Sequence, residues 1–241
     1  MSNIVINPYN FIVEASTLNR GLIAGGGSTD DIEYITIDTA SNAADFGDLI
    51  IAKQSGAGAS SATRGIFAGG TGAGAATIDY VTIAVLGNAA DFGDLTQGRM
   101  NLAGMYSATR CIFACGYTTT TVSTMDYITT DTLANATSFG TAYSGQENLQ
   151  GASSTTRGCF AGGYASSNVI QYITMDTTAA SLDFGDLTVG RYGAAGTSDK
   201  SRGVWGGGHS GGGGVGLNVI DYITIASTGN ATDFGDLQQA R

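Results

Sequence analysis

The chain has 241 residues, 42% of them hydrophobic, which is enough to bury a sizeable core in a single domain. Ten basic and twenty acidic residues give a formal net charge of -10, which disfavours nucleic acid and anionic lipid surfaces as partners. Since no basic leader and no long apolar run occur, we expect neither a signal peptide nor membrane insertion.

The three cysteines are Cys111, Cys115 and Cys159. An odd number of cysteines in a long chain is not a disulfide framework. We therefore expect small buried thiols and assembly in a reducing cytoplasm.

A repeat of 44 to 47 residues runs through the chain in five units. Each unit contains, in chain order, an arginine in an RGxFAGG-type segment, a tyrosine in an IDYITI-type segment and a phenylalanine in a DFGDL-type segment. The arginines are Arg20, Arg64, Arg110, Arg157 and Arg202, the tyrosines are Tyr34, Tyr80, Tyr127, Tyr172 and Tyr222, and the phenylalanines are Phe46, Phe92, Phe139, Phe184 and Phe234. The spacing from tyrosine to phenylalanine is 12 positions in every unit, and length varies only between the glycine pair and the tyrosine.

Four segments of each unit have the length and composition of β-strands. In the third unit these are residues 101–109, 110–116, 125–131 and 137–143, separated by Gly, Asn, Ser and Thr. No stretch keeps an apolar stripe at helical spacing, so helices are not expected.

Four strands repeated about every 45 residues predict an all-β fold, a five-bladed β-propeller with four antiparallel strands per blade. The first strand is rich in small residues, with Ala57, Gly58 and Ala59 in unit two and Gly193, Ala194, Ala195 and Gly196 in unit five, as convergence on a narrow axis requires. We expect one domain over residues 1–241, with an N-terminal extension 1–8 and blades at about 9–52, 53–98, 99–145, 146–190 and 191–241.

The chain ends favour a closed ring. The seventh residue after each phenylalanine is Lys53, Arg99, Gln146, Arg191 or Arg241, and Tyr9 is equivalent when the count runs back from Arg20. Residues 10–241 are thus five whole units. Residues 2–8 fall in the register of a fourth strand, so we expect Ile4, Val5 and Ile6 to pair onto the last blade.

The paired glycines after an apolar strand, the tyrosine, the later aromatic residue and the basic residue before the next inner strand together resemble the kelch repeat, with Phe where kelch blades usually carry Trp. The phrases IDYITI, GNAADFGDL and RGIFAGG also resemble repeat arrays in virion structural and tail-associated proteins of phages that infect marine cyanobacteria. This resemblance implies a virion component at a tail, fibre or decoration position.

Catalytic and metal-binding patterns are sparse. The single histidine, His209, lies in a Gly-rich loop without a second ligand of metal-site spacing, and we expect it to be exposed there. Paired acids flank the phenylalanine in four units (Asp45/Asp48, Asp91/Asp94, Asp183/Asp186 and Asp233/Asp236). Because they recur, we favour a structural role in turns, or pairing with the repeat arginines, over calcium binding. No metal and no cofactor is expected.

Function is expected on the loops between the second and third strands, residues 27–33, 71–79, 117–126, 164–171 and 209–221, because a rigid framework there carries variable segments. The candidate binding residues on this loop face are Asp30, Asp31, Tyr117, Tyr164, Asn168, His209 and Asn218. We expect a non-enzymatic virion structural or adhesion module that binds another virion protein or a host surface glycan, with homo-oligomerisation left open. The alternatives are an intracellular kelch-type scaffold and a carbohydrate-active enzyme that uses axial acids.

Overall fold

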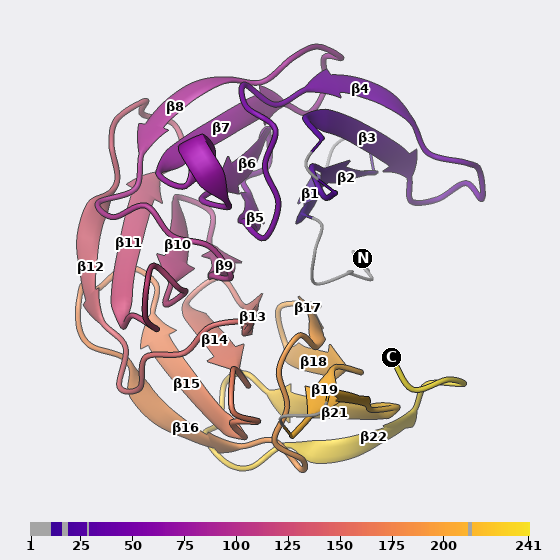
Figure 1. The fold of residues 1–241 in the computed structure, drawn as a ribbon, viewed down its shortest axis with the longest axis vertical. Coiled ribbons are helices and arrows are strands. Elements are labelled where there is room, and N and C mark those ends of the chain that lie inside the picture. The colour runs from indigo at the N-terminus through magenta and orange to yellow at the C-terminus, as the bar shows by residue number, and fades with distance from the viewer. Residues whose placement is uncertain (1–10, 16–18, 28, 212–213) are drawn as a thin grey trace.

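The computed structural model describes residues 11–15, 19–27, 29–211 and 214–241. It contains five four-stranded antiparallel sheets arranged as the blades of a propeller around a central axis (Figure 1). The predicted all-β, five-bladed architecture is confirmed. The expected pairing of residues 4–6 and the extension 1–8 lie outside the described residues.

Each blade is a meander in which consecutive strands pair. The first three blades are β1 (Phe11–Ala15), β2 (Arg20–Ala24), β3 (Asp31–Thr36) and β4 (Ala44–Asp48); β5 (Ala57–Ser60), β6 (Arg64–Ala68), β7 (Thr77–Thr82) and β8 (Ala90–Asp94); and β9 (Ala103–Tyr106), β10 (Arg110–Ala114), β11 (Thr124–Thr129) and β12 (Thr137–Thr141). The last two are β13 (Gln150–Ser153), β14 (Arg157–Ala161), β15 (Val169–Thr174) and β16 (Leu182–Asp186); and β17 (Ala195–Ser198), β18 (Arg202–Gly206), β21 (Val219–Thr224) and β22 (Thr232–Asp236).

Two short elements lie between the second and third strands. A 3-10 helix, η1 (Gly72–Gly74), follows β6, and a small hairpin of β19 (His209–Ser210) and β20 (Val215–Gly216) follows β18. Within the described part of the chain there is no α-helix, and no helix is long and apolar enough to cross a membrane.

Glycine lets the inner strands approach one another near the axis. A Cβ atom on Gly104 would lie 2.2 Å from the carbonyl oxygen of Gly58 in the preceding blade, and one on Gly151 would lie 2.2 Å from the oxygen of Gly104. A side chain at these positions would therefore push neighbouring blades apart. The small residues of the first strands are explained by this contact, as the sequence predicted.

Among the residues that the structure describes, the buried apolar side chains form four clusters, and each cluster is shared by two neighbouring blades. In the cluster between blades one and two, Phe46 of β4 packs with Val81 and Ile83 of the next blade. Equivalent clusters join blades two and three, three and four, and four and five. Each blade is thus stabilised by burying its faces against its neighbours.

The DFGD segment is a β-bulge that turns the phenylalanine into this core. In blade two, Ile78 pairs with Gly93 and Asp79 pairs with Asp91, so Phe92 is the extra residue. Gly93 has a φ of +140°, which glycine adopts without steric cost, and a Cβ there would lie 2.6 Å from a backbone oxygen of the next blade. The first acid accepts a hydrogen bond from the glycine N–H in three blades, which supports the expected structural role in a turn.

The repeat arginines do not pair with these acids, contrary to one expectation. Each guanidinium lies over the ring of the repeat tyrosine in its own blade, 4.6–4.9 Å from the ring centroid. In the first four blades the arginine also donates a hydrogen bond to a backbone carbonyl of the following blade, as Arg64 does to Thr130 at 2.6 Å. The tyrosine in turn packs edge-to-face on the repeat phenylalanine in every blade.

A buried ion pair crosses three of the four blade junctions. The cation is the seventh residue after the phenylalanine, and the anion is the residue before the tyrosine in the next blade, at the bulge. The pairs are Lys53–Asp79 at 3.2 Å, Arg99–Asp126 at 2.7 Å and Arg191–Asp221 at 2.7 Å. Both side chains of each pair are fully buried, so each charge depends on its partner.

The junction between blades three and four replaces this ion pair with amides. Gln146 and Gln171 occupy the two positions, and Gln171 accepts a hydrogen bond from the Ser144 N–H and donates one to the Ser144 carbonyl. The hydroxyl of Ser181 also donates to Gln171 at 2.8 Å. The position therefore holds either a charge pair or a neutral network, and in two of the charge pairs the buried Asp79 Oδ1 and the Nε and Nη1 of Arg191 have no hydrogen-bond partner in the described part of the chain.

Replacing Arg99 or Asp126 singly with glutamine is expected to destabilise the protein by about 3–5 kcal/mol, because each change leaves a buried charge without its partner. The double variant is expected to lose less than either single variant, since no charge remains unpaired. Chemical denaturation measures the free energy of unfolding. The exposed Lys200, changed to glutamine, is the control and should alter stability by less than about 0.5 kcal/mol. Additive losses in the double variant would contradict the coupling.

The three cysteines are free and buried, as predicted. Burial raises the pKa of Cys115 to about 11 and that of Cys159 to about 12, and it raises the pKa of Cys111 as well. Because the thiolate is the reactive form, we expect no labelling by an aromatic disulfide reagent at pH 8 until the chain is unfolded. A Tyr143→Cys variant, at a side chain that is 70% exposed, is the positive control and should label at once. Rapid labelling of the folded wild-type chain would be the contrary result.

Candidate functional site

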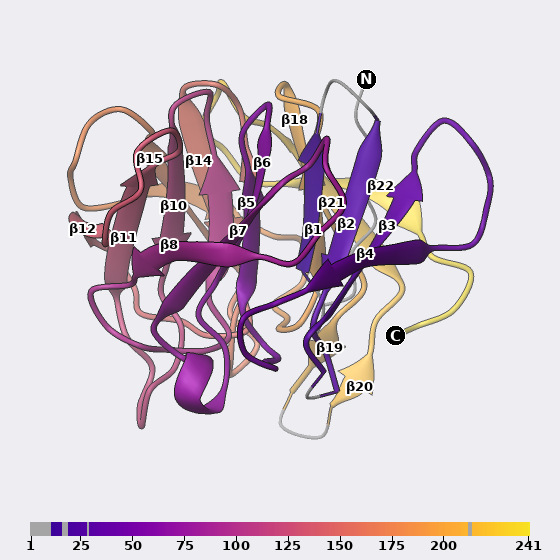
Figure 2. The same ribbon diagram turned by 90° about the horizontal axis from the view of Figure 1, so that it is seen from above.

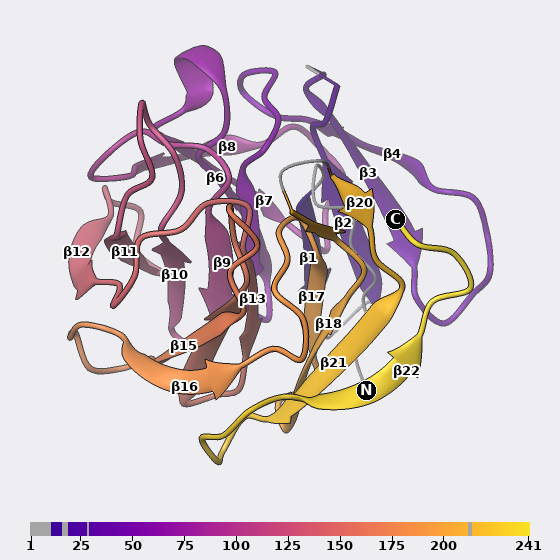
Figure 3. The same ribbon diagram turned by 60° about the horizontal axis from the view of Figure 1, so that its bottom comes forward.

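The loops between the second and third strands project from one face of the propeller. Figures 2 and 3 show η1 and the β19–β20 hairpin on the same side of the ring. The predicted loops extend too far at their C-terminal ends, because the third strands begin three residues before the repeat tyrosine, for example at Thr77 and Val169. The pairing of these residues with the fourth strand draws them into the sheet.

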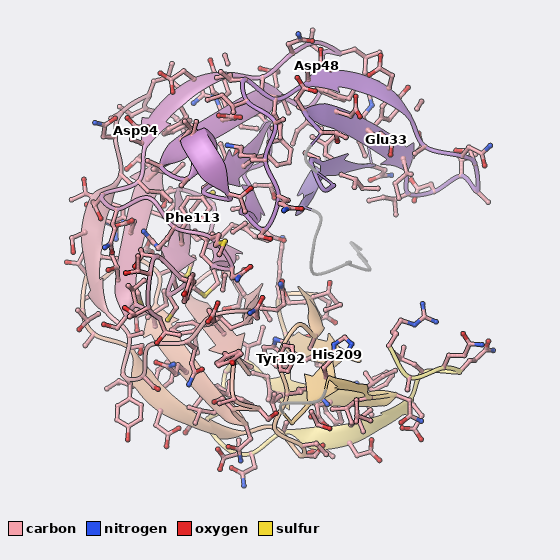
Figure 4. All side chains as sticks on the ribbon, in the orientation of Figure 1. Glu33, Asp48, Asp94, Phe113, Tyr192 and His209 are labelled. Atoms are coloured by element: carbon pink, nitrogen blue, oxygen red, sulfur yellow. The ribbon has the colours of Figure 1, made fainter. Side chains whose placement is uncertain are left out.

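An aromatic group lies on this face where blades four and five meet, and it consists of Tyr164, Tyr192 and His209. The rings of Tyr192 and His209 are stacked, with centroids 5.6 Å apart and an angle of 25° between their planes, and Figure 4 shows them side by side. The rings of Tyr164 and Tyr192 are 6.3 Å apart and tilted by 52°. Tyr164 is 59% exposed, while Tyr192 and His209 are half-buried.

Backbone hydrogen bonds hold this aromatic group in place. The N–H of His209 donates to the Tyr192 carbonyl at 2.9 Å, and the N–H of Tyr192 donates to the His209 carbonyl at 3.1 Å. The N–H of Tyr164 donates to the Glu147 carbonyl at 2.9 Å. The expectation of an exposed histidine in a Gly-rich loop is therefore corrected: His209 begins a strand and is fixed against a tyrosine ring.

The remaining loop-face candidates do not gather around this group. Tyr117 forms backbone bridges with Met100 and Thr121 inside the loop of blade three. Asp30, Asn168 and Asn218 occupy one repeat position, and each backbone carbonyl there accepts a hydrogen bond from a leucine N–H that follows the fourth strand. Their side chains are exposed, and Ala76 of blade two makes the same backbone hydrogen bond, so this bond does not depend on the side chain at that position.

Asp30, Asp31 and Asp48 form a cluster of carboxylates in blade one, with ligand oxygens within 4.8 Å of one another. The pairing of Asp31 with Asp48 across β3 and β4 brings them together. Oxygen ligands of this kind suit Ca²⁺. Among the described residues this is the one such cluster, and blade two has Ala76 and Thr77 at the positions of Asp30 and Asp31.

A cavity of about 190 Å³ opens on the opposite face, among the turns that join the first and second strands. Its lining includes the hydroxyls of Ser61, Ser107 and Ser154. Each of these hydroxyls accepts hydrogen bonds from backbone N–H groups of its own turn. The hydroxyls are therefore already engaged in turn structure.

Sequence reasoning missed Tyr192, the central ring of the aromatic group. A signal was present, because Tyr192 stands where the other units have Asn10, Gln54, Met100 and Glu147. Tyr192 therefore departs from the repeat in blade five, and the loop of that same blade contains His209, the single histidine of the sequence. The sequence does not indicate that Tyr192 and His209 are in contact, because only the folded structure sets the distance between the two residues.

A scan against protein-family models finds no match to this chain, and a search of curated protein sequences finds none either.

A Tyr192→Leu variant is expected to shift the ring-proton resonances of His209 downfield, because the stacked ring that shields them is removed. The chain has one histidine, so its proton NMR signals can be assigned without ambiguity. The matched control is Tyr143→Leu, at an exposed tyrosine outside the aromatic group, which should leave the signals in place. Unchanged His209 signals in the Tyr192 variant would show that the rings do not stack.

Proposed function

We propose that the protein is a non-enzymatic binding module of a virion, which recognises a host surface glycan through the aromatic group of Tyr164, Tyr192 and His209. The observation that carries this proposal is the ordered, partly exposed set of rings at the junction of blades four and five. Rigid tyrosine rings offer a broad apolar face with a polar edge, and little conformational entropy is lost when a ligand stacks on them.

A glycan suits this surface better than a large protein interface does. Stable protein interfaces bury on the order of 1,000 Å² or more and centre on buried aromatic or arginine anchors. Among the described loop residues between second and third strands, the exposed large hydrophobic side chains are Tyr164 and Val215. A small group of rings that carry the Tyr164 and Tyr192 hydroxyls and the His209 imidazole matches the size and mixed polarity of a sugar unit.

The framework uses eight of the ten basic side chains. Lys53, Arg99 and Arg191 are in buried ion pairs, and the five repeat arginines lie over tyrosine rings. This regular use of charge supports a scaffold that presents loops. The virion setting rests on the resemblance of the repeat phrases to cyanophage structural proteins.

A glycan array probed with the purified full chain tests the binding proposal. We expect selective binding that weakens about tenfold in Tyr164→Ala and in Tyr192→Ala, which corresponds to one stacking contact of about 1.4 kcal/mol. Tyr143→Ala is the matched control and should bind as the wild type does. Circular dichroism of each variant checks the fold. If the chain binds no glycan selectively, or if neither Tyr164→Ala nor Tyr192→Ala weakens binding, the glycan proposal is overturned. If purified particles lack the protein, the virion assignment is overturned.

A further inference from the structure

The cavity of about 190 Å³ on the face opposite the aromatic group lies where the inner strands end near the axis. Figure 1 shows the inner strands β5, β9 and β13 next to one another around this axis. The last residues of these strands, Ser60, Tyr106 and Ser153, form part of the cavity wall, and the turns that follow them complete it. Blades two, three, four and five all contribute residues, so the wall is shared by four blades.

Two residues of the wall depart from the repeat. The strand position of Tyr106 holds serine in blades two, four and five, as the pairing of the first two strands shows. The turn position of Lys200, two residues before the repeat arginine, holds Ala62, Ala108 and Thr155 in blades two to four. The two departures come from different blades, yet both residues line the same cavity. Residues that the framework needs recur from blade to blade, so these two are available to a ligand.

Lys200 is the charged residue of the wall. It lies outside the buried ion pairs and the arginine–tyrosine contacts of the framework. Its φ is +77°, a backbone conformation that is strained for a residue with a side chain and that clusters at ligand sites. Among the described residues that line the cavity, none is acidic. A cation in such a wall attracts an anion.

The carboxylate next to Lys200 in the sequence is held by its own turn. Asp199 takes the place of the turn serine of blades two to four. Its Oδ1 accepts hydrogen bonds from the Arg202 N–H at 2.7 Å, the Ser201 hydroxyl at 2.7 Å and the Ser201 N–H at 2.9 Å. These bonds, with the one from the Arg202 N–H foremost, lower the pKa of Asp199 to about 2. Asp199 is therefore directed into the turn that presents Lys200, and it does not line the cavity.

Three serine hydroxyls supply hydrogen-bond donors to the cavity. Ser60 is 2% exposed, and its hydroxyl has no hydrogen-bond partner among the described residues. The hydroxyls of Ser107 and Ser153 accept hydrogen bonds from backbone N–H groups, and neither hydroxyl donates one to a described residue. Because a buried hydroxyl without a partner is unfavourable, these donors favour a ligand that carries several acceptor atoms.

We propose that this cavity binds an acidic sugar of the hexuronate class, with the sugar carboxylate at Lys200, the sugar ring against Tyr106 and its hydroxyl oxygens at Ser60 and Ser107. The volume is below the roughly 300 Å³ at which pockets for drug-sized ligands begin, so it suits one small unit. A bare anion would leave the apolar face of Tyr106 uncovered, and a neutral sugar would leave the ammonium group of Lys200 without a partner. This site is separate from the aromatic group and does not rest on the function proposed for it.

Saturation-transfer NMR on the purified full chain, with glucuronate as the probe, tests the site. We expect glucuronate to bind more tightly than glucose, which lacks the carboxylate, and more tightly than acetate, which lacks the ring. Lys200→Gln is expected to raise the Kd for glucuronate about tenfold, because one charge-assisted contact is lost. Arg241→Gln is the matched control, since it removes the same charge from an exposed residue outside the cavity, and it should leave the Kd unchanged.

Changes at Tyr106 test the contact with the sugar ring. Tyr106→Phe keeps the aromatic face and is expected to bind glucuronate within about twofold of the wild type. Tyr106→Ser introduces the residue of blades two, four and five and is expected to weaken binding about tenfold. Circular dichroism of each variant checks the fold. Because Lys200 is exposed, its variant tests the site even if Tyr106→Ser lowers stability.

The acidic-sugar site is excluded if glucuronate shows no saturation transfer, or if glucose or acetate binds as tightly as glucuronate. It is also excluded if Lys200→Gln leaves the Kd for glucuronate unchanged. Tyr164→Ala, on the opposite face, should not alter glucuronate binding. Loss of glucuronate binding in Tyr164→Ala would place the sugar at the aromatic group instead, so the two proposed sites can fail independently of each other.

Discussion

The contact between one blade and the next determines the stability of this propeller, because a four-stranded sheet with apolar side chains on both faces is not stable alone in water. A bulge turns the repeat phenylalanine toward the next blade, and the glycine after it lets the two backbones approach. A cation from the connecting segment then meets an acid at the bulge of the following blade. Apolar burial, backbone contact and charge pairing thus all act at one junction.

The repeat leaves little chemistry free for function. Its arginines lie over tyrosines, its buried cations meet acids, and the first acid of the DFGD segment accepts a hydrogen bond from the glycine N–H. Features that differ between blades are therefore the informative ones. The aromatic group of Tyr164, Tyr192 and His209, and the carboxylate cluster of blade one, are two such departures. The proposed glycan contact uses the first because its rings are ordered by backbone bonds and one is exposed.

The number of blades, the four strands of each and the small residues of most inner strands follow from the sequence alone, because strand pairing and close packing impose local periods on the residues. The sequence also contained the ion pairs, since the residues at the two positions change together from Arg99 and Asp126 to Gln146 and Gln171, but recognising them requires the blades to be adjacent. Only the tertiary structure brought Tyr192 onto His209 and left Phe234 exposed. Contacts between distant segments depend on how the blades are placed, and no local period encodes that placement.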